Sequence, residues 1–145
     1  MIEDLYQQLI IDHGTQPRNK RELEGCSCSA KGHNPLCGDK ITVFLKVDGD
    51  LIVDAAFQGE GCAISVASAS IMSEIIKNID RKQAIGIMEE FTNCLTKDSD
   101  HNSLPIKLQA LAGVKKYPMR VKCATLAWHT FKSALNNENI ITSTE

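Results

Sequence analysis

Three cysteines and one aspartate have sequence neighbours that suit them to metal binding. Cys37 and Asp39 flank Gly38, whose conformational freedom lets a thiolate and a carboxylate converge on one ion. Cys62 stands where strand-like patterning gives way to helix-like patterning, and the free N–H groups of a helix start favour thiolate over thiol. Cys123 lies early in a predicted helix, where the same effect is weaker. Zinc accepts three sulfurs and one oxygen, and iron–sulfur clusters accept mostly thiolates.

The long intervals between these cysteines leave their association open. Neither the interval from Cys37 to Cys62 nor that from Cys62 to Cys123 matches a local zinc-finger spacing. One interpretation is a shared site formed by Cys37, Asp39, Cys62 and Cys123, and the other is three separate thiols. Arg120 comes three residues before Cys123, so in a helix it would lie on the same side and favour the thiolate.

The other cysteines and the histidines indicate no comparable site. Cys26 and Cys28 are two residues apart on a predicted strand, so they face the same way and cannot easily bridge each other. We interpret them as incidental thiols, with a second metal site as the alternative, and Cys94 as structural. A solvated or core role is expected for each histidine, although His33 is close in sequence to Cys37. The four histidines form no ligand pair at helical spacing: His13, His33, His101 and His129.

Composition and charge argue against several classes of protein. The length of 145 residues suits a single domain over 1–145. With 16 basic and 18 acidic side chains the net charge is −2, which argues against a nucleic-acid-binding protein. No apolar stretch approaches the ~18 residues of a membrane span, and the acidic start lacks the basic segment of a secretory signal. We therefore expect a cytoplasmic protein, whose six cysteines point to metal or thiol chemistry rather than disulfides.

One helix and three strands are predicted before Cys62. A helix over 2–13 carries an apolar stripe for which we expect core packing, made of Ile2, Leu5, Tyr6, Leu9 and Ile10. Residues 23–33 are weakly strand-like, and a loop follows over 34–39. Alternating apolar residues predict antiparallel strands over 40–47 and 51–57, joined by a tight turn. The inner face of the second strand is expected to carry Leu51, Val53, Ala55 and Phe57.

Helical periodicity dominates after Cys62. Asp80 and Gln83 resemble a capping box. Further helices are predicted over 81–92, over 104–112 and from Pro118 onward, with a polar loop at 96–103 and a polar tail at 136–145. The last helix is expected to bury Ala124, Ala127, Trp128, Phe131 and Leu135. Because strands precede most helices, we predict an α+β fold with a small three-stranded antiparallel sheet packed against a bundle of helices.

The motifs around these residues resemble one known family over nearly the whole chain. The segment Leu5–Gly14, followed by Pro17–Asn19, is similar to the opening helix and turn of the U-type iron–sulfur cluster assembly proteins, which include IscU, SufU and the N-terminal part of NifU. Asn34–Asp39, Gly59–Ser65 and Arg120–Trp128 resemble the three ligand segments of that family, in the same order. Three motifs in order are far more specific than any one of them.

Three features favour the SufU branch over the IscU scaffold branch. The scaffold branch has a histidine immediately before its third cysteine, where this chain has Lys122. It also has a chaperone-recognition motif rich in Pro, Val and Lys just upstream, where this chain has Lys115–Met119. The stretch between Cys62 and Cys123 also looks longer than in the scaffold branch.

The resemblance implies a role for each candidate residue. Cys37, Asp39, Cys62 and Cys123 would bind zinc, and Cys37 would accept sulfur as persulfide after the donor supplies a replacement ligand. Arg120 matches a family arginine associated with activating the donor, a SUF-type cysteine desulfurase. Downstream iron–sulfur assembly proteins would be further partners, and any enzymatic activity would be that of a sulfurtransferase.

Two other functions stay open at this point. The same ligands could hold iron or a [2Fe–2S] cluster on a scaffold, an interpretation that Lys122 disfavours. The chain could instead be a zinc-stabilised interaction module without transfer chemistry. A thiol–disulfide oxidoreductase is disfavoured because the sequence has no Cys-x-x-Cys pair.

Overall fold

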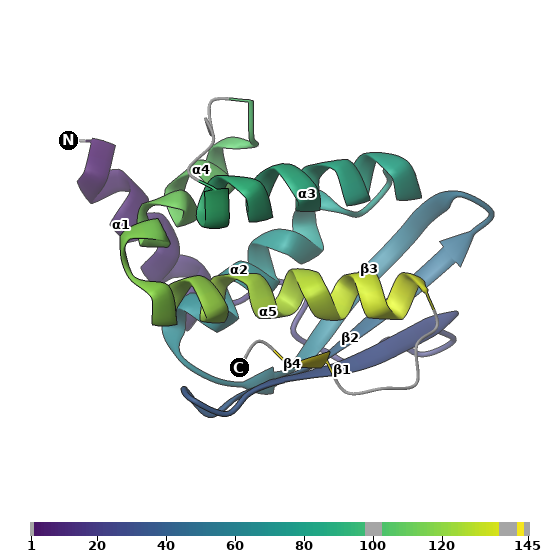
Figure 1. Cartoon of the computed structure of the whole chain (residues 1–145). Helices are drawn as coiled ribbons and strands as arrows, with labels where there is room; N and C mark the ends of the chain where they lie inside the picture. The colour runs from purple at the N-terminus through teal and green to yellow at the C-terminus, as the bar shows by residue number, and fades with distance from the viewer. Residues whose placement is uncertain (1, 98–102, 137–141, 144–145) are drawn as a thin grey trace.

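The computed structural model describes residues 2–97, 103–136 and 142–143 (Figure 1). Its helices are α1 (Ile2–Thr15), α2 (Ala63–Ile75), α3 (Arg81–Lys97), α4 (Ile106–Leu111), the 3₁₀ helix η1 (Ala112–Lys116) and α5 (Pro118–Leu135). Its strands are β1 (Cys28–Asn34), β2 (Asp39–Asp48), β3 (Leu51–Glu60) and β4 (Thr142–Ser143). No helix among these residues is long and apolar enough to cross a membrane.

The sheet has the strand order β3-β2-β1-β4. β1 pairs antiparallel with β2, and β2 pairs antiparallel with β3, so the predicted three-stranded antiparallel sheet is confirmed. Gly49 has a φ of 62° in the tight turn between β2 and β3, a conformation that glycine adopts without strain. The short β4, which the sequence did not predict, pairs parallel with β1 at Gly32 and His33.

The predicted inner face of β3 is only half right. Ala55 and Phe57 are buried, but Leu51 and Val53 are 43% and 39% exposed. The pairing register shifts by one residue, because Asp54 pairs with Lys46 whereas Ile52 pairs with Val47. Val53 is therefore the extra residue of a β-bulge, which reverses the alternation of faces on its far side. As a result Ile52 is buried in place of its two neighbours.

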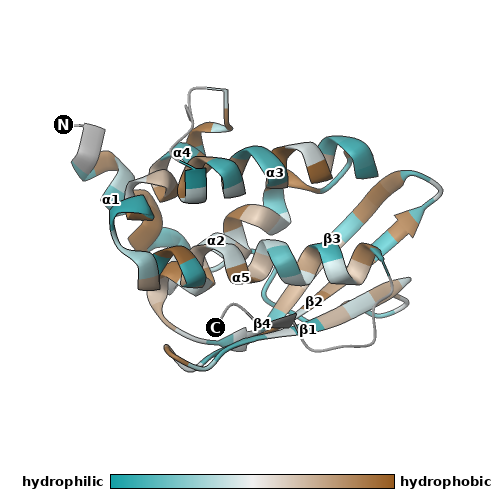
Figure 2. Ribbon diagram, viewed as in Figure 1, coloured by the Kyte–Doolittle hydropathy of each residue, from teal (hydrophilic) through white to brown (hydrophobic). Residues whose placement is uncertain are grey.

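The helices lie on one side of the sheet, and α5 lies along it (Figure 1). α5 packs on β1 and β2, and α2 packs between β3 and α5. Trp128 is fully buried at this junction. Its ring centroid lies 5.8 Å from that of Phe91 of α3 and 6.2 Å from that of Phe131. Figure 2 shows α3 and α5 banded in brown and teal, as expected for helices with one apolar face. The five predicted buried positions of the last helix are all buried.

Several element boundaries differ from the predicted ones. The Asp80–Gln83 capping box is present, with the Gln83 backbone N–H donating to Asp80 Oδ1 at 2.7 Å. However, α3 continues five residues past its predicted end, to Lys97. The chain also continues as η1 through Gly113, beyond the predicted end of the 104–112 helix. Most of the predicted 96–103 loop and most of the tail lie outside the described residues.

Helix α1 does not bury its apolar stripe as predicted. Leu5 is 63% exposed, whereas Leu9 and Ile10 are partly buried against the core. The residue that anchors the helix is His13, which is 1% exposed. Its Nδ1 lies 2.7 Å from Ser70 Oγ of α2, so a polar side chain holds the end of α1 against the central helix.

The surroundings of His13 predict a fall in stability at mildly acidic pH. Burial, then the charges of Lys107 and Arg18, lower the pKa of His13 below its ordinary value, although Glu74 and Asp12 oppose this. His13 therefore stays neutral in the folded protein while the unfolded chain binds a proton below about pH 6.5. Because the unfolded state then binds more protons, stability falls as the pH falls through this value.

Thermal melting of the parent and a His13→Gln variant across this range tests the prediction. His13→Gln should melt at a lower temperature near neutral pH, because its side chain does not reproduce the contacts of the imidazole. The difference in melting temperature between the two proteins should narrow from about pH 7.5 to about pH 5.5, since only the parent carries this titration. His129, whose pKa burial also lowers, is common to both proteins and cancels in the comparison. A gap that stays constant would contradict the prediction.

Candidate metal centre

Cys37 and Asp39 are positioned by the hairpin between β1 and β2. The last residue of β1, Asn34, pairs with Asp39, the first residue of β2. The turn between them places Gly38 at a φ of 70°, and the Cys37 amide donates to the Asn34 carbonyl at 3.3 Å. Asp39 shares the inner face of β2 with Ile41, so its side chain is fully buried.

Cys62 is the N-cap residue of α2, as the sequence predicted. Its backbone N–H donates to Asp39 Oδ1 at 2.9 Å, which orients the carboxylate from the helix end. Gly61 makes this close approach feasible, because a Cβ there would lie 2.4 Å from the same oxygen. The start of α2 therefore acts on the site through its backbone as well as through the Cys62 thiol.

Cys123 reaches the other two residues from the second turn of α5. Its Sγ lies 3.2 Å from Cys37 Sγ, and ligand atoms of Cys37, Asp39 and Cys123 all lie within 4.8 Å of one another. Cys62 falls outside this tight group, but its backbone N–H holds it against Asp39 at 2.9 Å. The structure thus brings three of the four predicted ligands together and places the fourth beside them.

The electrostatics at Cys123 differ from the sequence-based expectation. Burial, then hydrogen bonding with Cys37, Asp39 and Cys62, raises the pKa of the Cys123 thiol well above its ordinary value. The helix start has little influence because Cys123 is beyond the first turn of α5. The Arg120 guanidinium lies 4.7 Å from the centre of the exposed Tyr117 ring. A cation bound beside Cys123 would lower the pKa of its thiol and so favour the thiolate.

Asn34 also lies in the site, although the sequence analysis assigned it no functional role. Its side chain is fully buried, and Nδ2 lies 3.2 Å from Asp39 Oδ2 and 3.5 Å from Cys123 Sγ. The signal available in the sequence was a polar residue immediately before Pro35 at the base of the ligand loop. That signal alone does not distinguish a loop residue from a buried one.

The remaining thiols and His33 lie apart from the group. Among the described residues, the only cluster of three potential ligands is that of Cys37, Asp39 and Cys123. Cys28 is half-buried on β1, and burial raises the pKa of its thiol. Cys94 is fully buried in the core, in agreement with a structural role. His33 is half-buried on β1 between two buried neighbours, so its side chain leaves the strand on the opposite face from that of Asn34.

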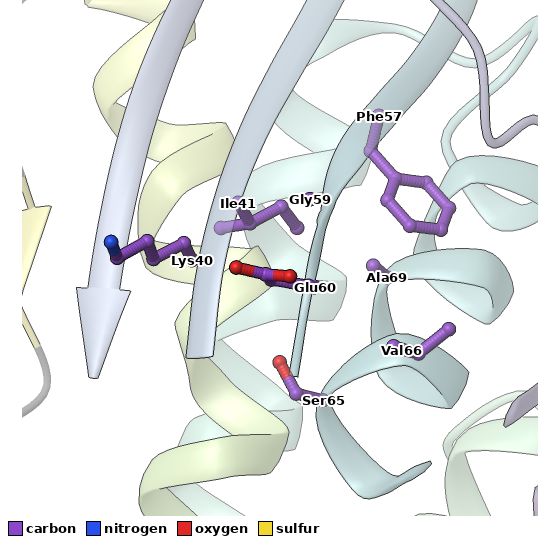
Figure 3. Close-up of a pocket in the computed structure, with 8 residues that line it drawn as sticks. All are labelled: Lys40, Ile41, Phe57, Gly59, Glu60, Ser65, Val66 and Ala69. Carbon is purple, nitrogen blue, oxygen red and sulfur yellow. The ribbon is translucent and has the colours of Figure 1, made fainter. Parts of the chain in front are cut away.

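A small pocket near the site offers no comparable chemistry. It lies where β2 begins and β3 ends beside the first turns of α2, with Lys40 and Glu60 to one side and Phe57, Val66 and Ala69 to the other (Figure 3). It has room for about one water molecule. The cluster of Cys37, Asp39 and Cys123, rather than this pocket, is the candidate functional site.

Fold and site together define an α+β protein in which thiols and a carboxylate gather between a hairpin loop and the starts of two helices. The chain belongs to the family of NifU-like N-terminal domains, whose family model matches residues 5–124. This membership confirms the resemblance that the three motifs indicated.

Relatives with known names include both branches of the family. The chain is 41% identical over 138 residues to the zinc-dependent sulfurtransferase SufU of Bacillus subtilis strain 168, covering 94% of this chain and 93% of the relative. It is 34% identical over 135 residues to the iron–sulfur cluster assembly scaffold protein IscU of Streptococcus pyogenes serotype M1, covering 92% of this chain and 84% of the relative. Among solved structures, the chain matches a candidate iron–sulfur cluster assembly scaffold protein for the SUF system from Fervidobacterium islandicum AW-1. The TM-score is 0.83 and the sequences are 36% identical, and the match covers 92% of this chain and 98% of that one. This match confirms the predicted fold.

Proposed function

We propose that this chain is a zinc-dependent acceptor of persulfide sulfur in iron–sulfur cluster assembly of the SUF type. The observation that carries the proposal is the convergence of Cys37, Asp39 and Cys123 within 4.8 Å, with Cys62 beside them. The similarity to a relative named as a zinc-dependent sulfurtransferase supports zinc and sulfur transfer over the other chemistries of the family.

The donor set fits zinc. Three sulfurs and one carboxylate oxygen are ligands that zinc takes in a tetrahedron, with bonds of about 2.0–2.3 Å. Such bonds place neighbouring ligand atoms about 3.3–3.8 Å apart, and the sulfurs of Cys37 and Cys123 already lie 3.2 Å apart. Zinc, when bound, keeps thiolates deprotonated and does no redox chemistry of its own.

The chemistry assigned to the chain is one sulfur transfer. The Cys37 thiolate attacks the outer sulfur of a persulfide on the donor, a new S–S bond forms at Cys37, and the donor's S–S bond breaks to leave its cysteine as a thiolate. The transferred sulfur keeps its proton and its oxidation state, so the step needs no oxidant. Cys37 is half-buried on a turn, which makes it more accessible to a donor than the buried Cys123.

The proposed donor is a cysteine desulfurase of the SUF type, and the proposed setting is the cytoplasm. A protein that passes persulfide between thiols requires a compartment that keeps thiols reduced. Downstream iron–sulfur assembly proteins would receive the sulfur.

One combined experiment separates this function from its alternatives. The purified chain is analysed for metal, incubated with a desulfurase and cysteine, and separately reconstituted with iron and sulfide without oxygen. Zinc together with sulfur on the protein supports the proposal. A coloured, transferable cluster would support the scaffold function that the IscU relatives carry in their names. Zinc without any sulfur uptake would instead indicate an interaction module.

Arg120→Ala is expected to weaken desulfurase activation about tenfold while zinc content stays unchanged. Arg120 is exposed three residues before Cys123 and holds its charge over the Tyr117 ring, so it can contact a partner but cannot ligate zinc. A charge-assisted hydrogen bond is worth about 1.5–3 kcal/mol. Desulfurase turnover with added protein measures the effect, and Lys132→Ala, an exposed cation farther along α5, serves as the control. Equal turnover with both variants would contradict the role.

A further inference from the structure

The side-chain amide of Asn34 faces two proposed ligands at once. Its Nδ2 donates to Asp39 Oδ2 at 3.2 Å and lies at hydrogen-bond distance, 3.5 Å, from Cys123 Sγ. Asn34 is fully buried at the end of β1, so no bulk water competes for these contacts. The amide has two N–H groups, which is the number that the two acceptors require.

The other end of this amide is unsatisfied. Among the described residues, Asn34 Oδ1 is one of three buried side-chain polar atoms without a hydrogen-bond partner. Turning the amide over would place that oxygen against the Asp39 carboxylate and the Cys123 sulfur, where it would be repelled. A buried acceptor left unpaired is unfavourable. The benefit of an asparagine at this position therefore lies in its two N–H contacts.

The proposed ligands are restrained to different degrees. Asp39 is held by Asn34 and also by the Cys62 backbone N–H. Cys123 is held by Asn34 and by its place inside α5. Cys37 sits on the turn between two strands and contacts the group through its sulfur, 3.2 Å from that of Cys123.

We propose that Asn34 is a positioning residue that fixes Cys123 and Asp39 as permanent ligands and thereby leaves Cys37 as the ligand that exchanges. An N–H donor stabilises Cys123 as a thiolate and reduces its tendency to leave a metal or to attack another sulfur. The inference rests on the proposed function, because it concerns which thiol of the metal site reacts. Hydrogen-bonded neighbours of metal ligands typically change metal affinity 10–100-fold when they are removed.

The test compares the parent with Asn34→Leu, which removes both N–H groups at similar shape. Thr130→Val is the matched control, since Thr130 is a buried hydrogen-bonded side chain on the same helix as Cys123. Each zinc-loaded protein is titrated with a competing chelator and then treated with limiting alkylating reagent, followed by mass spectrometry of the Cys37 and Cys123 peptides. Asn34→Leu should lower zinc affinity about 10–100-fold and lower the ratio of Cys37 to Cys123 labelling about tenfold. Thr130→Val should leave the ratio unchanged.

The labelling ratio separates positioning from general destabilisation. A ratio equal to that of the parent in Asn34→Leu would overturn the proposal even if the affinity fell. If Asn34→Leu does not fold, the side-chain amide protons of Asn34 in the metal-loaded parent decide the matter by NMR. Slow exchange with solvent, together with coupling to an NMR-active cadmium ion in place of zinc, supports the proposal, and rapid exchange without coupling refutes it. Failure of the parent to bind any metal would count against the proposed function instead.

Discussion

Cys37→Ser is expected to abolish sulfur acceptance and, because it removes a proposed zinc ligand, to lower the melting temperature as well. The hydroxyl of serine is not ionised at neutral pH and is a far weaker nucleophile than a thiolate, so the S–S bond cannot form at this position. Cys37 is on a turn outside the core, so the substitution removes no apolar packing of consequence. The measurement is the mass of the protein after incubation with a desulfurase and cysteine, compared with the parent.

Three other cysteines provide controls for this result. Cys26→Ser and Cys28→Ser should accept sulfur nearly as the parent does, because neither residue belongs to the clustered group. Cys94→Ser should also accept sulfur, although its fully buried position predicts some loss of stability. Sulfur uptake by Cys37→Ser at the level of the parent would show that Cys37 is not the acceptor.

Asp39→Ala is expected to release the metal and to destabilise the protein. The carboxylate is fully buried and is oriented by Asn34 and by the Cys62 N–H, so its loss removes a ligand and leaves both donors unpaired. A metal present at 100 times its dissociation constant contributes about 2.7 kcal/mol to folding. For a chain of this length its loss lowers the melting temperature by roughly 5–10 °C.

The comparison is thermal melting with and without a chelator. The parent should melt lower when the chelator is present, whereas Asp39→Ala should melt low in both conditions. Asp12→Ala, which removes an exposed carboxylate paired with Arg18, should respond to the chelator as the parent does. If Asp39→Ala responded to the chelator as fully as the parent, Asp39 would not be a ligand.

Local patterns in the sequence predicted most of the fold. Alternation along 40–47 and the capping box at Asp80 are short-range signals, and both elements formed where expected. The bulge at Val53 was not predictable in this way, because it depends on pairing with a partner strand rather than on the strand itself. The same holds for α1, where contact with Ser70 of α2 buries His13 while Leu5 stays exposed.

The candidate site was predictable in composition but not in geometry. The neighbours of Cys37, Cys62 and Cys123, and the carboxylate of Asp39, marked the four candidate ligands from residue types alone. The resemblance to the family then implied that they form one site. The sulfurs of Cys37 and Cys123 lie 3.2 Å apart because α5 packs on β1 and β2. No local sequence pattern predicts this packing. The contribution of Asn34 depends on the same long-range packing, so it became visible only in the structure.

The central claim is that Cys37 is the thiol that accepts sulfur, and peptide-level mass spectrometry tests it most directly. The zinc-loaded protein is incubated briefly with its desulfurase and cysteine, quenched with an alkylating reagent, digested and analysed over time. We expect the mass of one additional sulfur to appear first on the peptide carrying Cys37, with the Cys123 peptide unmodified. Sulfur that appears first on Cys123 would contradict the account and favour a scaffold-type mechanism.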